Sequence, residues 1–176
     1  MNKNGFVYPV IILTVICLVV SGLLAGVNSV TEPIIAEANR IAAEAARARV
    51  LPTADTFNAV EDLSAMPAGV NEVYTAANGA GTVVTVSGSG YNGTVKIIVG
   101  ISSDGTIAGS EVLEHGETVG LGSRIEGEAF RSQFVGKDAS LDGVSIIGGS
   151  TISSKCFMDL VEEAFKAAEL VAGKGA

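Results

Sequence analysis

A long uncharged segment near the start of the chain constrains the fold more than any other feature. No charged residue occurs from Asn4 to Thr31, and within that range Phe6–Val27 is almost wholly apolar. A helix of about 20 apolar residues crosses the hydrocarbon core of a bilayer, so this segment is long enough to span one. Lys3 precedes it and Glu32 follows it, so the positive-inside tendency predicts a cytoplasmic N-terminus and an extracytoplasmic remainder.

The alternative to a membrane anchor is a cleaved signal peptide. The apolar stretch is longer than the ~7–15 residues usual in such a peptide, and no clean A-x-A cleavage site follows it. Cys17 follows Ile16, which is not a small residue, and this argues against lipoprotein processing. We therefore expect residues 1–31 to form an uncleaved anchor that contacts the lipid bilayer through Phe6–Val27.

A second helix is expected after the anchor. Thr31–Pro33 is expected to end the membrane span, and Ile34–Leu51 is rich in Ala, Glu and Arg with its apolar residues on one face. Pro52 ends this helix. Residues 32–52 are therefore predicted to be a stalk, and its short apolar face offers an alternative role as a contact for a partner subunit.

Residues 53–176 are predicted to form an α+β domain with an antiparallel sheet and flanking helices. The apolar run of Gly93–Ser102 is nearly continuous, which indicates a central strand. The full set of predicted strands is Val70–Ala77, Thr82–Ser87, Gly93–Ser102 and Thr106–Leu113, separated by turn signals. Glu126–Phe134 is expected to be a short helix ending at Gly136, and the segment around Leu141–Ile147 a loop or short strand.

The C-terminal segment is predicted to be an amphipathic helix with one buried stripe. We expect it to start after Ser153, with Ser153 or Ser154 as the N-cap, and to stop at Gly173. The apolar stripe recurs at spacings of three and four residues, through Phe157, Leu160, Val161, Ala164, Ala168 and Val171.

Composition excludes several classes of function. The formal net charge of −8 leaves no basic surface for phosphate backbones, so nucleic acid is not an expected partner. The two cysteines lie far apart in sequence and the chain has one histidine, so neither a zinc nor an iron–sulfur site is expected. No serine, histidine and acid occur in a pattern that supports acyl transfer, and no catalytic residue is assigned.

Two glycine-rich loops are the candidate functional segments. Gly148–Ser154, with the sequence GGSTISS, combines glycines and hydroxyls directly before a helix, where free amides and the helix dipole favour a phosphate. His115–Arg124, with the sequence HGETVGLGSR, exposes amides for a flat or anionic ligand. Each loop also has a plain structural interpretation, as an ordinary capped helix start and as a tight turn. Together they favour a cofactor that bears phosphate.

The segment Gly90–Ile125 carries a resemblance to a known family. Its sequence, GYNGTVKIIVGISSDGTIAGSEVLEHGETVGLGSRI, resembles the FMN-binding domain of the G subunit of Rnf complexes. These are membrane ferredoxin:NAD oxidoreductases that couple electron transfer to ion translocation, and the C subunit of sodium-translocating NADH:quinone reductase shares the domain. The resemblance extends over the whole chain, from the anchor through a Thr-Glu-Pro segment and a Leu-Pro to the C-terminal loop.

The resemblance implies a covalently bound FMN. The family motif SGATxTS falls on Gly148–Ser154, so Thr151 matches the threonine that carries FMN through a phosphoester; the neighbouring Ser150 is an alternative acceptor. Gly148, Ser150 and Ser153 stand where the family has Ser, Ala and Thr, Val119 where it has Pro, and Ser145 where it has Asp. The cofactor-binding residues expected on this basis are Thr151, Gly149, Ser150, Ser153, Ser154, Glu117, Thr118, Gly120, Leu121 and Gly122.

The resemblance also implies a function and partners. The expected protein is an electron-transfer subunit of an ion-translocating oxidoreductase, in a bacterial or archaeal cytoplasmic membrane, coupled to Na⁺ or H⁺. Its expected partners are the other membrane and peripheral subunits of the Rnf complex and a flavin transferase that matures it. The alternatives are an anchored assembly module that carries no flavin, and a free extracytoplasmic flavoprotein reductase.

Overall fold

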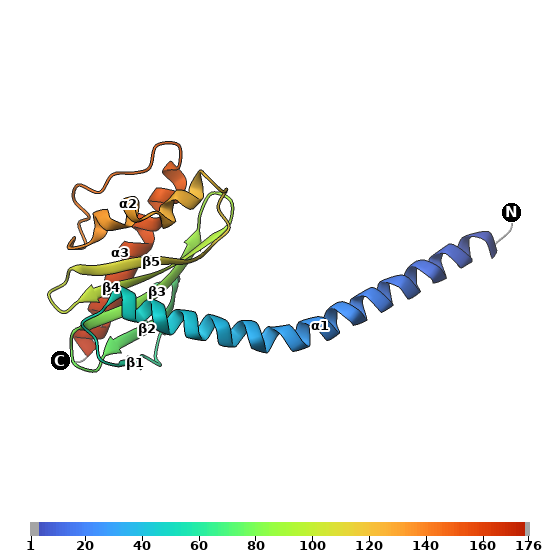
Figure 1. The fold of residues 1–176 in the computed structure, drawn as a ribbon, viewed down its shortest axis with the longest axis horizontal. Coiled ribbons are helices and arrows are strands. Elements are labelled where there is room, and N and C mark those ends of the chain that lie inside the picture. Colours follow the sequence, from blue (N-terminus) through green and yellow to red (C-terminus); the bar gives the residue numbers. More distant parts are fainter. Residues whose placement is uncertain (1–3, 175–176) are drawn as a thin grey trace. The chain divides into compact units, whose positions relative to one another are not determined.

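The computed structural model describes residues 4–174 of the chain, which divide into two compact units. The first unit extends to Ala42 and the second begins at Ala43. The long helix α1 (Asn4–Val50) belongs mostly to the first unit, and its last residues belong to the second. Figure 1 shows the elements in chain order.

Helix α1 is one uninterrupted helix, so the residues expected to form the anchor and those expected to form the stalk belong to one helix and not to two. Both Pro9 and Pro33 lie inside it. A proline removes one main-chain hydrogen bond of a helix, but the helix continues past Pro33. Among the residues that the structure describes, α1 is the one helix long and apolar enough to cross a membrane. None of the 18 consecutive residues that form its most apolar stretch is buried.

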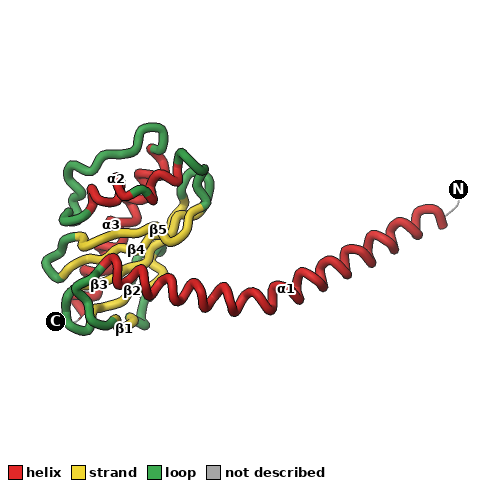
Figure 2. The backbone as a smooth tube through the Cα atoms, viewed as in Figure 1, coloured by secondary structure: helices red, strands yellow, loops and turns green. Residues whose placement is uncertain are grey.

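The second unit is built on a five-stranded sheet in which every strand pairs antiparallel with its neighbour in sequence. Figure 2 shows the strands side by side in this unit. The strands are β1 (Phe57–Ala59), β2 (Val70–Ala76), β3 (Gly81–Ser89), β4 (Thr94–Ser102) and β5 (Ile107–His115). The four predicted strands are thus confirmed within two residues at each end, whereas the short β1 was not predicted. Strand β4 is interior as expected, but β3 is the middle strand.

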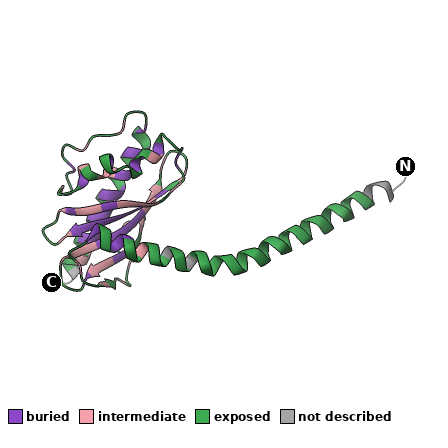
Figure 3. Cartoon of the chain, viewed as in Figure 1, coloured by how far each residue is buried: buried purple, intermediate pink, exposed green. Residues whose placement is uncertain are grey.

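Apolar side chains fill both faces of the sheet. Along β4, Val95, Ile97 and Val99 belong to a core shared with helix α3 (Thr151–Lys174), while Ile98 faces a smaller core. The smaller core includes Ala46 and Val50 from the end of α1, so this end of the helix belongs to the domain. Because both faces are covered, the interior strands are buried, as Figure 3 shows.

Three short helical turns replace the single helix predicted at Glu126–Phe134. They are η1 (Gly122–Glu126), α2 (Glu128–Arg131) and η2 (Ser132–Phe134). They bring Phe130 and Phe134 against Phe157 of α3, with ring centroids 4.9 to 5.4 Å apart and the rings tilted or edge to face. A loop without regular strand follows Gly136 and leads to α3.

Helix α3 starts earlier than predicted. Its first residue is Thr151, and the amide of Ser154 already donates to the carbonyl of Ser150 at 2.9 Å, so neither Ser153 nor Ser154 is the N-cap. Both serines are instead buried in the first turn. The helix also continues through Gly173 to Lys174, the last described residue, so the predicted stop at Gly173 is wrong. The predicted apolar stripe is buried or partly buried.

Candidate functional site

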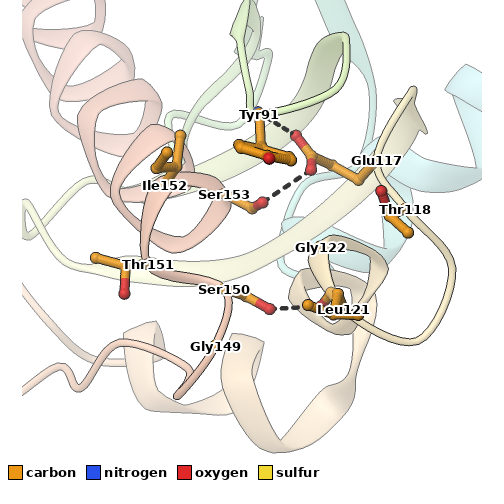
Figure 4. A pocket seen from close by; sticks show the side chains of 10 residues that line it. All are labelled: Tyr91, Glu117, Thr118, Leu121, Gly122, Gly149, Ser150, Thr151, Ile152 and Ser153. Carbon is orange, nitrogen blue, oxygen red and sulfur yellow. Dashed lines mark hydrogen bonds between the residues drawn. The ribbon is translucent and has the colours of Figure 1, made fainter.

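The two glycine-rich loops line one cavity of about 530 Å³ at the start of α3. One wall is the loop between β5 and η1, and another is the first turn of α3 with the loop before it. Tyr91, from the turn between β3 and β4, completes the lining. Figure 4 shows the ten lining residues, which are Tyr91, Glu117, Thr118, Leu121, Gly122, Gly149, Ser150, Thr151, Ile152 and Ser153.

Glu117 joins the three segments of this cavity. One carboxylate oxygen, Oε1, accepts a hydrogen bond from the amide of Tyr91 at 2.6 Å, and Oε2 accepts one from the hydroxyl of Ser153 at 2.9 Å. Figure 4 shows both bonds converging on the carboxylate. Glu117 is only 6% exposed, so it is a buried acid whose two oxygens are both satisfied by neutral donors.

Two glycines leave the space that the Glu117 side chain occupies. A Cβ atom added at Gly90 would overlap Oε1 of Glu117, and one added at Gly122 would overlap Oε2. Any side chain at either position would therefore displace the carboxylate. This packing gives a physical reason for a glycine at each of these positions.

His115 and Glu126 support the loop from behind. The amide of Glu117 donates to Nδ1 of His115 at 3.1 Å, which leaves Nε2 to carry the ring proton, and Nε2 lies in hydrogen-bond contact with Oε1 of Glu126. The imidazole is therefore engaged at both nitrogens and holds the main chain of the loop in place.

The loop before α3 is fixed by three further hydrogen bonds. The hydroxyl of Ser150 donates to the carbonyl of Leu121 at 2.7 Å, which ties the two glycine-rich loops together. The amide of Ile147 donates to the hydroxyl of Ser154 at 3.1 Å, and the guanidinium of Arg124 donates to the carbonyl of Gly148 at 3.1 Å. Gly149 adopts a φ of 81°, a left-handed conformation that favours glycine and turns the chain into the helix.

Thr151 differs from the serines around it. Its side chain is exposed, whereas Ser150, Ser153 and Ser154 are buried, and its hydroxyl makes no hydrogen bond within the described part of the chain. It is also the first residue of α3, where the amides of the first turn have no partner within the helix. An accessible hydroxyl thus lies beside a set of free amide donors.

The mouth of the cavity is apolar. Tyr91, Leu121 and Ile152 all line it, and their side chains are 70%, 53% and 54% exposed. Exposed apolar and aromatic side chains beside unpaired amides suit a ligand with a flat apolar part and an anionic part. A cavity of this volume lies within the range of about 300–1,000 Å³ that is usual for small-molecule sites.

Most of the residues predicted from the sequence come together here. Of the ten, all but two line the cavity: Gly120 lies outside it at the tip of its loop, and Ser154 is fully buried behind it. Tyr91 and Ile152 line it but were not predicted. The segment Gly90–Ile125, which carries the family resemblance, begins with a Gly-Tyr-Asn-Gly turn, and this turn is the signal that could have identified Tyr91. Within residues 4–174, no group of three or more acidic, histidine or cysteine side chains is placed to hold a metal ion.

Two family models match the chain. Residues 1–50 match the RnfG N-terminal region, and residues 90–166 match the FMN-binding domain. The FMN-binding match therefore includes every residue that lines the cavity.

Curated proteins from several organisms are similar over most of the chain. The G subunit of the proton-translocating ferredoxin:NAD(+) oxidoreductase complex of Clostridium ljungdahlii is 30% identical over 168 residues, covering 86% of this chain and 85% of the relative. The G subunit of the Na(+)-translocating complex of Acetobacterium woodii is 37% identical over 172 residues, covering 82% and 83%. The G subunit of an ion-translocating oxidoreductase complex of Cereibacter sphaeroides is 37% identical over 143 residues, covering 70% and 62%.

Proposed function

Because the chain belongs to the family of G subunits of Rnf-type ion-translocating oxidoreductase complexes, we propose that it is the FMN-carrying electron-transfer subunit of such a complex. The complex oxidises or reduces ferredoxin and NAD and couples this reaction to the movement of Na⁺ or H⁺. The chain is similar both to a subunit of a proton-translocating complex and to a subunit of a Na⁺-translocating complex, so either ion fits the proposal. The chain by itself has no expected catalytic residue and acts as a carrier within the complex.

The FMN is attached to Thr151. The observation that carries this assignment is the exposed hydroxyl of Thr151 at the N-terminus of α3, on the edge of a cavity within the FMN-binding match. The neighbouring hydroxyls fit the role less well, because Ser150 is 5% exposed and already donates to Leu121, and Ser153 donates to Glu117.

Attachment is a phosphoryl transfer from FAD, performed by a separate flavin transferase. The Thr151 oxygen forms a bond to the phosphorus of the FMN half, the bond between the two phosphates breaks, and AMP leaves. The hydroxyl proton is lost to solvent or to a base of the transferase. The reaction requires a hydroxyl that another protein can reach, which the exposure of Thr151 provides.

The residues of the cavity suit the two ends of FMN. The unpaired amides of the first turn of α3 would hold the phosphate, because the amides and the helix dipole both favour negative charge. The Glu117–Gly122 loop, with Tyr91 and Ile152, would hold the flavin ring against apolar side chains. Bound FMN supplies the capacity to accept and release electrons, while the protein sets its position and electrostatic surroundings. Covalent attachment retains the cofactor on the extracytoplasmic side.

The apolar first part of α1 anchors the subunit in the cytoplasmic membrane through Phe6–Val27, and the N-terminus lies in the cytoplasm. Residues 1–31 form the anchor, residues 32–52 a stalk whose last residues pack into the core of the domain, and residues 53–176 the rest of the extracytoplasmic domain. The other Rnf subunits are the partners that deliver and remove electrons.

Intact mass of the purified chain, together with ultraviolet fluorescence of its band on a denaturing gel, tests the function. We expect a mass higher by one FMN less water and a fluorescent band when the chain is produced with a flavin transferase. Thr151→Ala should remove both, while Ser150→Ala should keep both. An unmodified wild-type chain from such a host would favour the assembly-module alternative, and a loaded chain that purifies without other Rnf subunits would favour a free reductase.

A further inference from the structure

The buried carboxylate of Glu117 has a consequence for any flavin held in the cavity. Its two oxygens accept hydrogen bonds from the Tyr91 amide and the Ser153 hydroxyl, which is the bonding pattern of an ionised carboxylate. Glu117 is therefore a negative charge held in a fixed place in the cavity wall.

Within the described residues, no cation neutralises this charge. The ion pairs of the domain lie elsewhere, and none reaches Glu117. Its nearest basic neighbour in the sequence, His115, accepts a hydrogen bond from the Glu117 amide and contacts Glu126 instead. Arg124, which belongs to the same loop region, donates to the carbonyl of Gly148. The donors to the carboxylate itself, an amide and a hydroxyl, carry no net charge.

The position of the charge is fixed by the two hydrogen bonds of the carboxylate and by its close packing against two glycines. Gly90 and Gly122 contact the two carboxylate oxygens so closely that neither can bear a side chain. The carboxylate thus cannot rotate out of the wall without breaking both hydrogen bonds. Since it is buried, solvent screens it weakly, and its field acts across the cavity at low effective dielectric constant.

We propose that Glu117 lowers the reduction potential of the flavin in this cavity. The inference rests on the proposed FMN function and adds the residue that tunes the cofactor. A flavin gains negative charge when it is reduced, and a fixed negative charge beside it disfavours that gain. The protein therefore makes its flavin a stronger reductant than a cavity lined only by neutral groups would.

Four variants separate the effect of the Glu117 charge on the flavin potential from the effect of the side chain's shape. Each is a variant of the full chain, loaded with FMN in a host that contains the transferase. Glu117→Gln removes the charge at nearly constant size, whereas Glu117→Asp keeps the charge but shortens the side chain. Thr118→Lys leaves Glu117 intact and adds a positive charge at an exposed lining position. Glu128→Gln is the matched control, because it removes one carboxylate from a surface position outside this cavity.

The measurement is a spectroscopic redox titration of the purified proteins, preceded by intact mass to establish the flavin content. We expect the midpoint potential to rise in Glu117→Gln, to rise by a smaller amount in Thr118→Lys, and to stay near wild type in Glu117→Asp and Glu128→Gln. If Glu117→Gln fails to fold or to take up FMN, Thr118→Lys tests whether the flavin responds to a charge on this wall of the cavity, and an unchanged potential in that variant would overturn the inference.

Three results would overturn the inference. The first is an unchanged potential in flavin-loaded Glu117→Gln, or in Thr118→Lys where Glu117→Gln does not load. The second is an equal rise in Glu117→Asp, which would trace the effect to packing and not to charge. The third is a wild-type chain whose mass shows no flavin, and this result alone would also overturn the proposed function.

Discussion

The hydroxyl of Ser150 donates a 2.7 Å hydrogen bond to the carbonyl of Leu121, and this bond joins the two loops that form the cavity. The next residue, Thr151, keeps its hydroxyl exposed. Two adjacent hydroxyl residues therefore have separate roles, with Ser150 holding the loops together and Thr151 available for modification.

Ser150→Ala should keep the flavin but lower the stability of the domain. The change removes the hydrogen bond that joins the two loops, while the Leu121 carbonyl keeps its bond from the Arg124 amide at 3.2 Å, so we expect a loss of about 0.5–1.5 kcal/mol. Denaturant unfolding of the flavinylated protein measures the loss, and intact mass reports the flavin. An unmodified mass for this variant would indicate that Ser150, and not Thr151, is the acceptor.

Gly122→Ala should distort the cavity. Its new Cβ would overlap a carboxylate oxygen of Glu117, so the loop must shift, at a cost of about 1–3 kcal/mol for overpacking. We expect a lower unfolding midpoint and less flavin per chain. Gly148→Ala is the control, because a Cβ at Gly148 meets no atom within 4 Å. Equal effects from the two substitutions would contradict the proposed contact between Gly122 and Glu117.

Phe157→Ala should destabilise the whole domain. Phe157 is fully buried, and its ring packs against those of Phe130 and Phe134. Truncation of such a side chain typically costs about 3–5 kcal/mol, through lost burial and the cavity left behind. Denaturant unfolding measures the change, and Ile152→Ala, at an exposed position of the same helix, should cost far less.

Two aspartates in turns, Asp104 and Asp138, should contribute to a loss of folding stability at acidic pH. Hydrogen bonds from the hydroxyl and then the amide of Thr106 lower the pKa of Asp104, and those of Ser140 lower the pKa of Asp138 in the same way. Each pKa in the folded state is below the unfolded value of 3.8, so the stabilisation is present above that value and is lost as the pH falls through the folded pKa.

The Asp104→Asn and Asp138→Asn double variant tests this pH dependence. Thermal unfolding near neutral pH and at about pH 3 should show a smaller acid-induced loss in the variant than in the wild type. An identical loss in both proteins would show that other carboxylates cause it.

The Cys156 thiol should react slowly in the native protein. Burial, followed by the negative charges of Asp159, Glu117 and Glu163, raises the pKa of this thiol and so reduces the reactive thiolate. Alkylation with iodoacetamide at mildly alkaline pH, read by peptide mass, should label Cys156 far more slowly in the folded than in the denatured chain. Rapid labelling of the folded chain would mean that the first turns of α3 open readily.

The strands of the domain were predictable because their apolar residues and turn signals are local in sequence. The short β1 was not, because three residues carry too little pattern to distinguish a strand from a loop. The continuation of α1 through Pro33 and the start of α3 at Thr151 also escaped prediction. Pro33 is a local signal for a helix end, yet the helix continues through it. The hydroxyls of Ser153 and Ser154, which suggested an N-cap, instead bond to Glu117 and to the Ile147 amide, which lie elsewhere in the sequence.

The site was predictable only in part, because some of its features are local in the sequence and others are not. Each glycine-rich loop is visible in the sequence, but only the fold places them side by side. Tyr91 lies 26 residues before Glu117, and their contact runs through the Tyr91 amide. No side-chain pattern reports such a contact. The role of Gly122 likewise becomes clear only once the Glu117 carboxylate is seen against it.

The order of the strands has a consequence for the stage of folding at which FMN can be attached to the protein. Because each strand pairs with its neighbour in sequence, the sheet can form hairpin by hairpin as the chain is synthesised. The core is still open at that stage, since Phe157 and the other buried residues of α3 close one whole face of the sheet. Thr151 is the first residue of that same helix. The proposed acceptor therefore takes its place in the cavity only when α3 packs on the sheet, and a chain whose α3 has not yet packed offers the transferase neither a finished cavity nor an ordered threonine.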